Sequence, residues 1–130
     1  MRDITIIIII LITIFAGDLV VNRYLGHTTD ELIKNLTSLK ENVVKASETE
    51  NRDEVKDEMG KVEESWKRIS EIWAIFVIHQ EVDNIEQALI KTKSMINDGN
   101  IEDAIPEIET AIFFVEHVKQ REKLMLENIF

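Results

Sequence analysis

The apolar residues of this chain follow two patterns, and the change between them lies near residue 21. Eight of the eleven residues at positions 4–14 are isoleucine, and no charged residue interrupts positions 4–17. Positions 4–21 hold 18 residues, and a helix of that length rises about 1.5 Å per residue and spans roughly 27 Å, enough to cross the hydrocarbon core of a bilayer. We therefore expect residues 1–21 to form a transmembrane anchor.

Farther along the chain, apolar residues recur at spacings of three and four, which places them on one face of an α-helix. Four such stripes follow one another, and their members are the predicted core: Leu32, Leu36, Leu39, Val43 and Ala46; Val55, Met59, Val62, Trp66, Ile69, Trp73 and Phe76; Val82, Ile85, Leu89, Thr92 and Ile96; Ala104, Ile108, Ala111, Val115 and Val118. The alternating pattern of strands is absent. The sequence thus predicts an all-α fold, with residues 22–27 as a short linker and residues 28–130 as an acidic helical domain.

Capping and turn residues indicate where these helices begin and end. The spacing of Thr28 and Glu31 is that of a capping box, which predicts that the first helix of the domain begins there. At residues 97–100, Asp98 and Gly99 predict a left-handed turn that ends the third helix. Pro106 would lie in the first turn of the fourth helix if Asp103 caps it, or would kink that helix if it begins at residue 100.

The junction between the second and third stripes leaves two arrangements open, because neither Gly nor Pro interrupts it. A near-repeat at an offset of about 49 residues, in which Asn51 corresponds to Asn100 and Trp66 to Val115, favours two successive helical hairpins. We therefore expect a four-helix bundle built from two hairpins. The alternative is three helices, with one long helix over residues 52–97.

Charge and cysteine content exclude several classes of function. The chain has 15 Lys and Arg against 25 Asp and Glu, a formal net charge of −10, and nearly all of this charge lies beyond residue 21. Nucleic-acid binding requires basic residues gathered on one face, whereas the densest basic sites here are short groups such as Lys67-Arg68. The absence of cysteine excludes thiolate catalysis and cysteine-ligated zinc.

The first segment has the features of an anchor rather than of a removable signal. A signal peptide needs small residues before its cleavage site, but cleavage after Ala16 or Gly17 would place Ile14 or Phe15 three residues before the cut. We favour an uncleaved single-pass anchor, with cleavage as the alternative. Arg2 and the amino terminus give the front flank a weak positive charge, which places the acidic domain outside the cytoplasm, although Arg23 acts against this orientation.

The most suggestive polar group is on the third predicted helix. His79, Asp83 and Glu86 are spaced by four and three residues and share a helix face, and an antiparallel fourth helix would bring Glu116 and His117 nearby. These five residues are the candidates for a metal or ligand site. Two observations count against such a site. The Glu-x-x-His spacing of di-iron bundles is absent. Glu116 and His117 are adjacent in the sequence, so their side chains diverge by about 100° around the helix and cannot both face the third helix. We therefore predict no metal and no cofactor, and expect both histidines to form hydrogen bonds beside the core.

No Ser or Thr is set in a nucleophilic arrangement, so we predict that the protein is not an enzyme.

Two apolar runs are wider than one stripe: the six residues that begin with Trp73 and end with Ile78, and the four that begin with Ile112 and end with Val115. Most of these side chains are expected in the core, together with Leu124, Met125, Leu126, Ile129 and Phe130. The alternative is that part of this surface receives a protein partner or the membrane.

Several of these features together resemble a known family. They are the short isoleucine-rich anchor, the Thr29-Asp30-Glu31 start, the two tryptophans, the block over residues 79–86, His117, and the endings Glu122-Lys123-Leu124 and Glu127-Asn128-Ile129. The chain resembles the bacterial family called domain of unknown function forty-three sixty-three, whose members are short, singly anchored proteins of low-GC Gram-positive bacteria. The resemblance spans nearly the whole chain and implies no activity, substrate or cofactor. Lys119-Gln120 stands where a proline-bearing turn is expected in relatives.

The resulting functional hypothesis is a single-pass protein of the cell membrane with an extracytoplasmic helical domain. We expect a structural, sensory or protein-interaction module that contacts the membrane through its N-terminal helix and binds a protein partner. A small metal- or ligand-binding domain is the rival hypothesis, and a domain that faces the cytoplasm as an adaptor is the third.

Overall fold

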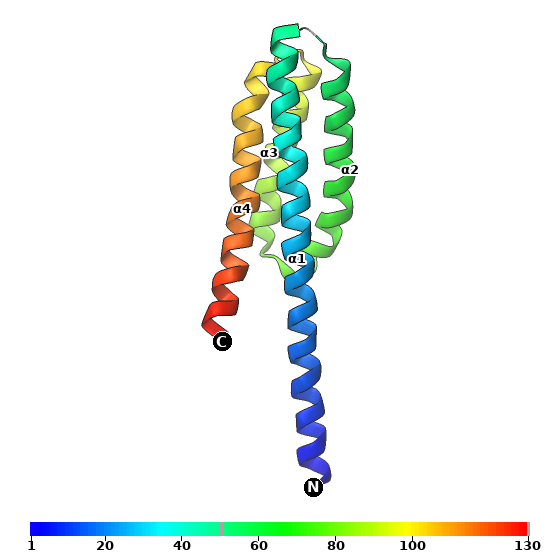
Figure 1. Cartoon of the computed structure of the whole chain (residues 1–130), viewed down its shortest axis with the longest axis vertical. Coiled ribbons are helices and arrows are strands. Elements are labelled where there is room, and N and C mark those ends of the chain that lie inside the picture. The colour runs from blue at the N-terminus through cyan, green and yellow to red at the C-terminus, as the bar shows by residue number, and fades with distance from the viewer. Residues whose placement is uncertain (50, 130) are drawn as a thin grey trace.

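The computed structural model describes the backbone of residues 1–49 and 51–129, and the side chains of these residues except those of Leu126, Asn128 and Ile129. This part of the chain is helical and contains no strand (Figure 1). Its elements in order are α1 (Arg2–Thr49), α2 (Asp53–Phe76), α3 (His79–Asn97), the 3₁₀ turn η1 (Ile101–Asp103) and α4 (Ala104–Ile129). The predicted all-α fold with four helices is confirmed.

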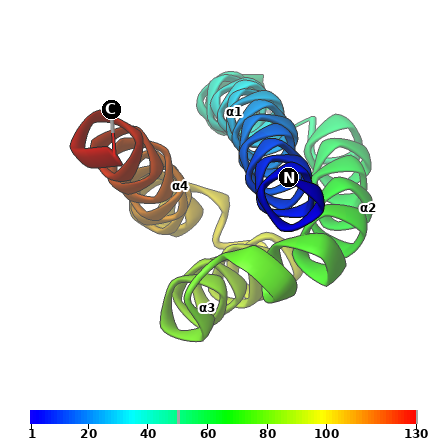
Figure 2. The ribbon, with the colours of Figure 1, turned by 90° about the horizontal axis from the view of Figure 1, so that it is seen from below.

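The four helices form an up-and-down bundle with α1 and α3 at opposite corners. α1 packs against α2 and α4, and α3 packs against the same two helices, as the end-on view shows (Figure 2). The sequential pairs α1–α2 and α3–α4 are the two predicted hairpins. The first half of α1 projects from the bundle beyond every other element (Figure 1).

The predicted stripes form the core almost without exception. Every member of the four stripes except Phe76 is buried, and Leu36, Leu39, Val43, Trp73 and Ile108 are fully enclosed. Phe76 was expected in the core, but its side chain is 45% exposed. Phe76 is the last residue of α2, and the residue that follows it, Val77, occupies the core instead.

Two tryptophans occupy the centre of one end of the core. The rings of Trp66 and Trp73 meet edge to face, with centroids 6.0 Å apart and planes at 85°, a geometry that aromatic pairs favour. The buried indole Nε1–H of Trp73 donates a hydrogen bond of 2.9 Å to Oγ1 of Thr28 on α1. A bond between residues 45 positions apart thus joins α1 to α2 at this level.

The helix is not interrupted at the boundary expected between anchor and domain. Residues 22–27 are helical, and α1 continues through them to Thr49 instead of beginning at the Thr28 capping box. The hydroxyls of Thr28 and Thr29 donate back along the same helix, to the carbonyl oxygens of Tyr24 and Gly26, both at 2.9 Å. These threonines are also buried, because they face α2 and the core rather than the end of a helix.

The remaining helix boundaries follow the predicted turns. α2 and α3 are separated by the extended backbone of Val77 (ψ 145°) and Ile78 (ψ 131°), which excludes the alternative of one long helix over residues 52–97. Gly99 has φ 83°, the left-handed conformation that ends α3. Pro106 lies in the first turn of α4, and no break occurs at Lys119-Gln120, where relatives were expected to turn.

The C-terminal end of α4 does not cover the core as expected. Leu124 and Met125 are more than half exposed, while Leu126, Ile129 and Phe130 lie outside the described side chains. α4 extends past the beginning of α3, because Glu81, near the start of α3, already contacts His117 and Arg121 of α4. The last turns of α4 therefore lack α3 as a neighbour.

Candidate functional site

The five predicted site residues are divided among separate interactions. Nε2 of His79 lies 3.8 Å from Oδ2 of Asp83, and the His79 side chain is 84% exposed. Glu86 instead accepts a hydrogen bond from the indole Nε1–H of Trp66, across the interface between α3 and α2. The three residues thus share one helix, as expected, but only two of them contact one another.

A second polar cluster joins α3 to α4 and contains a residue that was not among the candidates. Oε1 of Glu81 lies 2.9 Å from Nδ1 of His117 and 3.4 Å from Nη1 of Arg121. The Glu81 side chain is only 11% exposed, so its carboxyl group is satisfied by His117 and Arg121 rather than by water. Beside the cluster is an open cavity of about 390 Å³, whose apolar lining includes Ile78 and Phe113.

Glu122 adds a second carboxyl group to this end of the bundle. Partial burial raises the pKa of Glu122, the nearby carboxylate of Glu81 raises it further, and Arg121 opposes both effects. Two carboxylates and one guanidinium therefore interact in a limited space. Through Glu81 and its contacts with His117 and Arg121, this arrangement joins α3 to α4.

The structure does not assemble the predicted cluster into a metal centre. No group of three or more His, Asp or Glu side chains in the described part of the chain could hold a metal ion. His117 contacts Glu81, whereas Glu116 faces a separate surface hollow lined also by Lys34 and Lys119. Adjacent residues on a helix point in different directions, which is the physical reason that Glu116 and His117 were not brought together.

Glu81 was missed although the sequence contained a signal for it. It precedes the core residues Ile85, Ala88 and Thr92 at spacings of four, three and four, so it continues the buried stripe of α3. A carboxylate at a stripe position needs a partner from another helix. Neither the stripe nor its spacing reveals that this partner is His117, because the contact depends on how α3 and α4 are paired.

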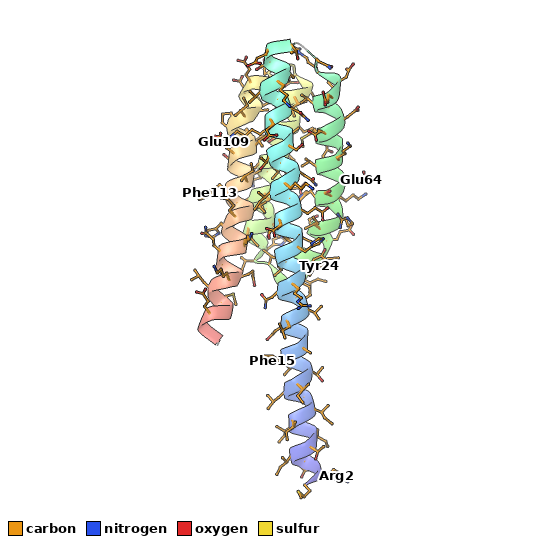
Figure 3. The ribbon with its side chains drawn as sticks, in the orientation of Figure 1. Arg2, Phe15, Tyr24, Glu64, Glu109 and Phe113 are labelled. Atoms are coloured by element: carbon orange, nitrogen blue, oxygen red, sulfur yellow. The ribbon has the colours of Figure 1, made fainter. Side chains whose placement is uncertain are left out.

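The two apolar runs are divided between core and surface. In the first run, Trp73 and Val77 are buried, while Ile75 and Ile78 are exposed. In the second, Val115 is buried and Phe113 points away from α4 into solvent (Figure 3). A separate groove of about 620 Å³ lies between α2 and α3, with Trp66 and Glu86 in its lining.

The most distinctive surface of the molecule is the free half of α1. It is long and apolar enough to cross a membrane, and none of its most apolar 18-residue window is buried in the protein. Figure 3 shows side chains such as Phe15 projecting from it on all sides. The first buried residue of α1 is Leu25, four residues after the apolar segment.

Comparisons with known proteins identify a family, but no individual curated protein or solved structure that matches. One family model matches residues 19–129, which covers the whole bundle but not the isoleucine-rich segment that precedes it. This match includes the block over residues 79–86 and His117, on which the resemblance rested. The chain therefore belongs to the family described as domain of unknown function (DUF4363).

Proposed function

We propose that this protein is a single-pass membrane protein whose bundle faces away from the cytoplasm and acts by contact with another protein, without catalysis. The observation that carries the proposal is α1 itself. Its exposed apolar half and its core half form one helix of 48 residues without a break. Such a helix would hold the bundle directly at the surface of the membrane.

The continuity of α1 also favours a structural or sensory role. A flexible linker would let the bundle rotate freely relative to the membrane, whereas a continuous helix transmits tilt and rotation. The bond between Thr28 and Trp73 lies only one turn above Leu25, so the link to α2 begins close to the apolar segment. A partner that moved the bundle would thereby move the membrane helix as well.

A role without chemistry is supported by the partners of the polar residues. Glu81, Glu86 and His117 each form a bond between helices, and such bonds set helix register. For the partner contact we propose the surface around Phe113, which is 62% exposed on α4. A large exposed aromatic side chain beside a cavity is typical of protein-binding surfaces.

A charge in the apolar segment tests the anchor. Arginine at the centre of a membrane helix costs about 3 kcal/mol, so Ile12→Arg should move the full-length protein from the carbonate-washed membrane fraction to the soluble fraction. Ile90→Arg is the matched control, because Ile90 is similarly exposed but lies on α3. If both variants stay in the membrane fraction, or if the mature protein begins near Asp18, the anchor is wrong.

Protease accessibility tests the orientation. Protease added to intact cells without their wall should remove the bundle and leave the anchor, because the positive flank of the first residues should stay inside. Complete protection of the bundle would instead place it in the cytoplasm, as an adaptor.

A photo-crosslinker at position 113 tests the partner surface in living cells. We expect a crosslinked product of one size from position 113 and none from position 64, which is exposed on α2 (Figure 3). Equal labelling from both positions, or none from either, would contradict a partner at Phe113.

A further inference from the structure

Several large apolar side chains are exposed at the end of the bundle from which the free half of α1 emerges. They come from α2, from the turn that follows it and from α4, and we call them the apolar collar: Ile75, Phe76, Ile78, Leu124 and Met125. Beyond residue 21, the other large exposed apolar side chains among the described residues are Val44, Ile72, Ile90 and Phe113. Most of these lie farther from this end, so the collar is a local concentration.

Contacts between helices give the height of the α4 part of the collar. Asp30 of α1 pairs with Lys119 of α4 at 2.6 Å, and Lys40 pairs with Glu109 at 2.8 Å. The two helices are therefore antiparallel, and a step of ten residues toward the end of α1 matches a step of ten residues toward the start of α4. By this register Leu124 lies level with Leu25, only four residues beyond the end of the apolar segment, or about 6 Å.

The α2 part of the collar lies at the same height. Trp73 is hydrogen-bonded to Thr28, and Phe76 follows Trp73 by almost one turn in the antiparallel helix. Phe76 is therefore also level with about Leu25. Figure 1 shows the turn between α2 and α3 and the end of α4 at this lower end of the bundle, and Figure 2 shows them on different sides of α1.

We propose that the apolar collar rests in the interface of the lipid bilayer, so that a phospholipid surface covers the end of the bundle around the anchor. This inference rests on the proposed membrane anchor. Its basis is geometric, because side chains from separate elements share one level, and that level is the end of the apolar segment. Apolar groups of surface-bound helices enter the boundary of headgroups and acyl chains by about 5–10 Å, which matches the height of the collar.

The charged residues beside the collar are compatible with a phospholipid surface. Lys123 can extend toward lipid phosphates while its aliphatic stem stays with apolar neighbours, whereas Arg121 is held by Glu81. Glu122, the acid between them, is partly buried, and its raised pKa eases loss of its charge. Glu127 is exposed farther along α4 and opposes binding to anionic lipid, so we expect contact with zwitterionic phospholipid.

The absence of cysteine makes the test direct, because single labels can be introduced into the full-length chain. Environment-sensitive fluorophores are attached to Phe76→Cys, Leu124→Cys, Phe113→Cys and Ile12→Cys. Each protein is reconstituted in phosphatidylcholine vesicles with either normal or brominated acyl chains, since bromine quenches only fluorophores in contact with lipid. Phe113 is the matched control for Phe76, because it is an exposed phenylalanine about 22 Å above the end of the apolar segment.

The proposal expects strong quenching by brominated lipid at positions 12, 76 and 124, and several-fold weaker quenching at position 113. Quenching at position 12 but not at 76 or 124 would overturn the collar and leave the anchor standing. No quenching at position 12 would contradict the membrane anchor, and therefore also the proposal that the apolar collar contacts lipid. A blue-shifted emission at positions 76 and 124 that bromine does not quench would show a covering protein copy, and would also overturn the proposal. Position 124, at the helix end, keeps the test valid if Phe76→Cys weakens folding.

Discussion

Residues 4–21 and 25–46 belong to the same helix, yet their apolar side chains are distributed differently around its axis. In the first segment, isoleucines on every side of α1 are about half exposed or more. In the second, one stripe carries the buried apolar side chains, and Leu32, Leu36 and Leu39 within it are almost completely buried, while Val44 lies outside it and is exposed. Backbone conformation does not distinguish the two segments. One continuous helix thus carries two side-chain patterns, and each pattern matches its surroundings. Residues 25–46 face the packed bundle on one side, whereas residues 4–21 are apolar on all sides, as the proposed bilayer requires.

The largest expected effect comes from removing the same side chain in both segments. Leu36→Ala should lower the free energy of unfolding by about 2–5 kcal/mol, because it leaves a cavity in the core. Leu11→Ala should leave it almost unchanged, since Leu11 contacts no core. Chemical denaturation in detergent micelles, followed by tryptophan fluorescence, measures this, because both tryptophans lie in the bundle. Equal losses for the two variants would contradict the division of α1.

A smaller effect is expected where α1 enters the bundle. Thr28→Val removes the acceptor of the Trp73 indole N–H and leaves a buried donor unpaired, so it should cost about 1–3 kcal/mol. Thr29→Val is the control, because that hydroxyl bonds only to a carbonyl of its own helix and its loss should cost less than about 1 kcal/mol. The same denaturation experiment ranks the two variants. A larger loss at Thr29 would show that the bond to Trp73 does not hold α1.

Two glycines sharpen the comparison, one at the junction within α1 and one in the turn that ends α3. Gly26 lies within α1, and a methyl group there would meet no atom within 4 Å, so Gly26→Ala should stabilise the bundle by about 0.5–1 kcal/mol. Gly99→Ala should destabilise it by about 1 kcal/mol or more, because the φ of 83° disfavours a side chain. Thermal unfolding should thus shift in opposite directions. An unchanged or lowered melting temperature for Gly26→Ala would contradict a helix that continues unbroken through residues 22–27.

The smallest effect concerns pH. Because the pKa of Glu122 is raised in the folded state, mainly by burial and then by Glu81, ionisation of this group opposes folding. Glu122→Gln should therefore stabilise the protein above the raised pKa. This gain should shrink as the pH falls through the raised pKa and disappear below the usual value of a glutamate.

Glu116→Gln controls for the loss of one negative charge, because Glu116 is exposed on the same helix. Melting temperatures of the two variants and the unmodified protein are compared from pH 7 downward. A gain for Glu122→Gln that persists at low pH, or an equal gain for Glu116→Gln, would contradict the assignment to Glu122.

The comparison also shows how far the sequence could predict the candidate site. His79 and Asp83 share a helix face because residues four apart always do, and the structure pairs them. The partner of Glu86 was not predictable in this way, because Trp66 lies on another helix, 20 positions earlier. Phe76 continued its stripe and is nevertheless exposed, because periodicity does not show that α2 ends at this residue and that Val77 in the following turn takes the core position.

The amino-acid sequence by itself determined the four stripes, the turn at Gly99 and the apolar segment at the beginning of the chain. Each of these depends on residues within a few positions of one another, where spacing and backbone preference suffice. Only the tertiary structure decided that α1 passes unbroken from this segment into the bundle, and that Glu81 contacts His117. The local cap signal at Thr28 was overridden because its hydroxyl faces Trp73, 45 residues later in the chain. Which helix lies beside which is a property of the whole packed core, and no short pattern encodes it.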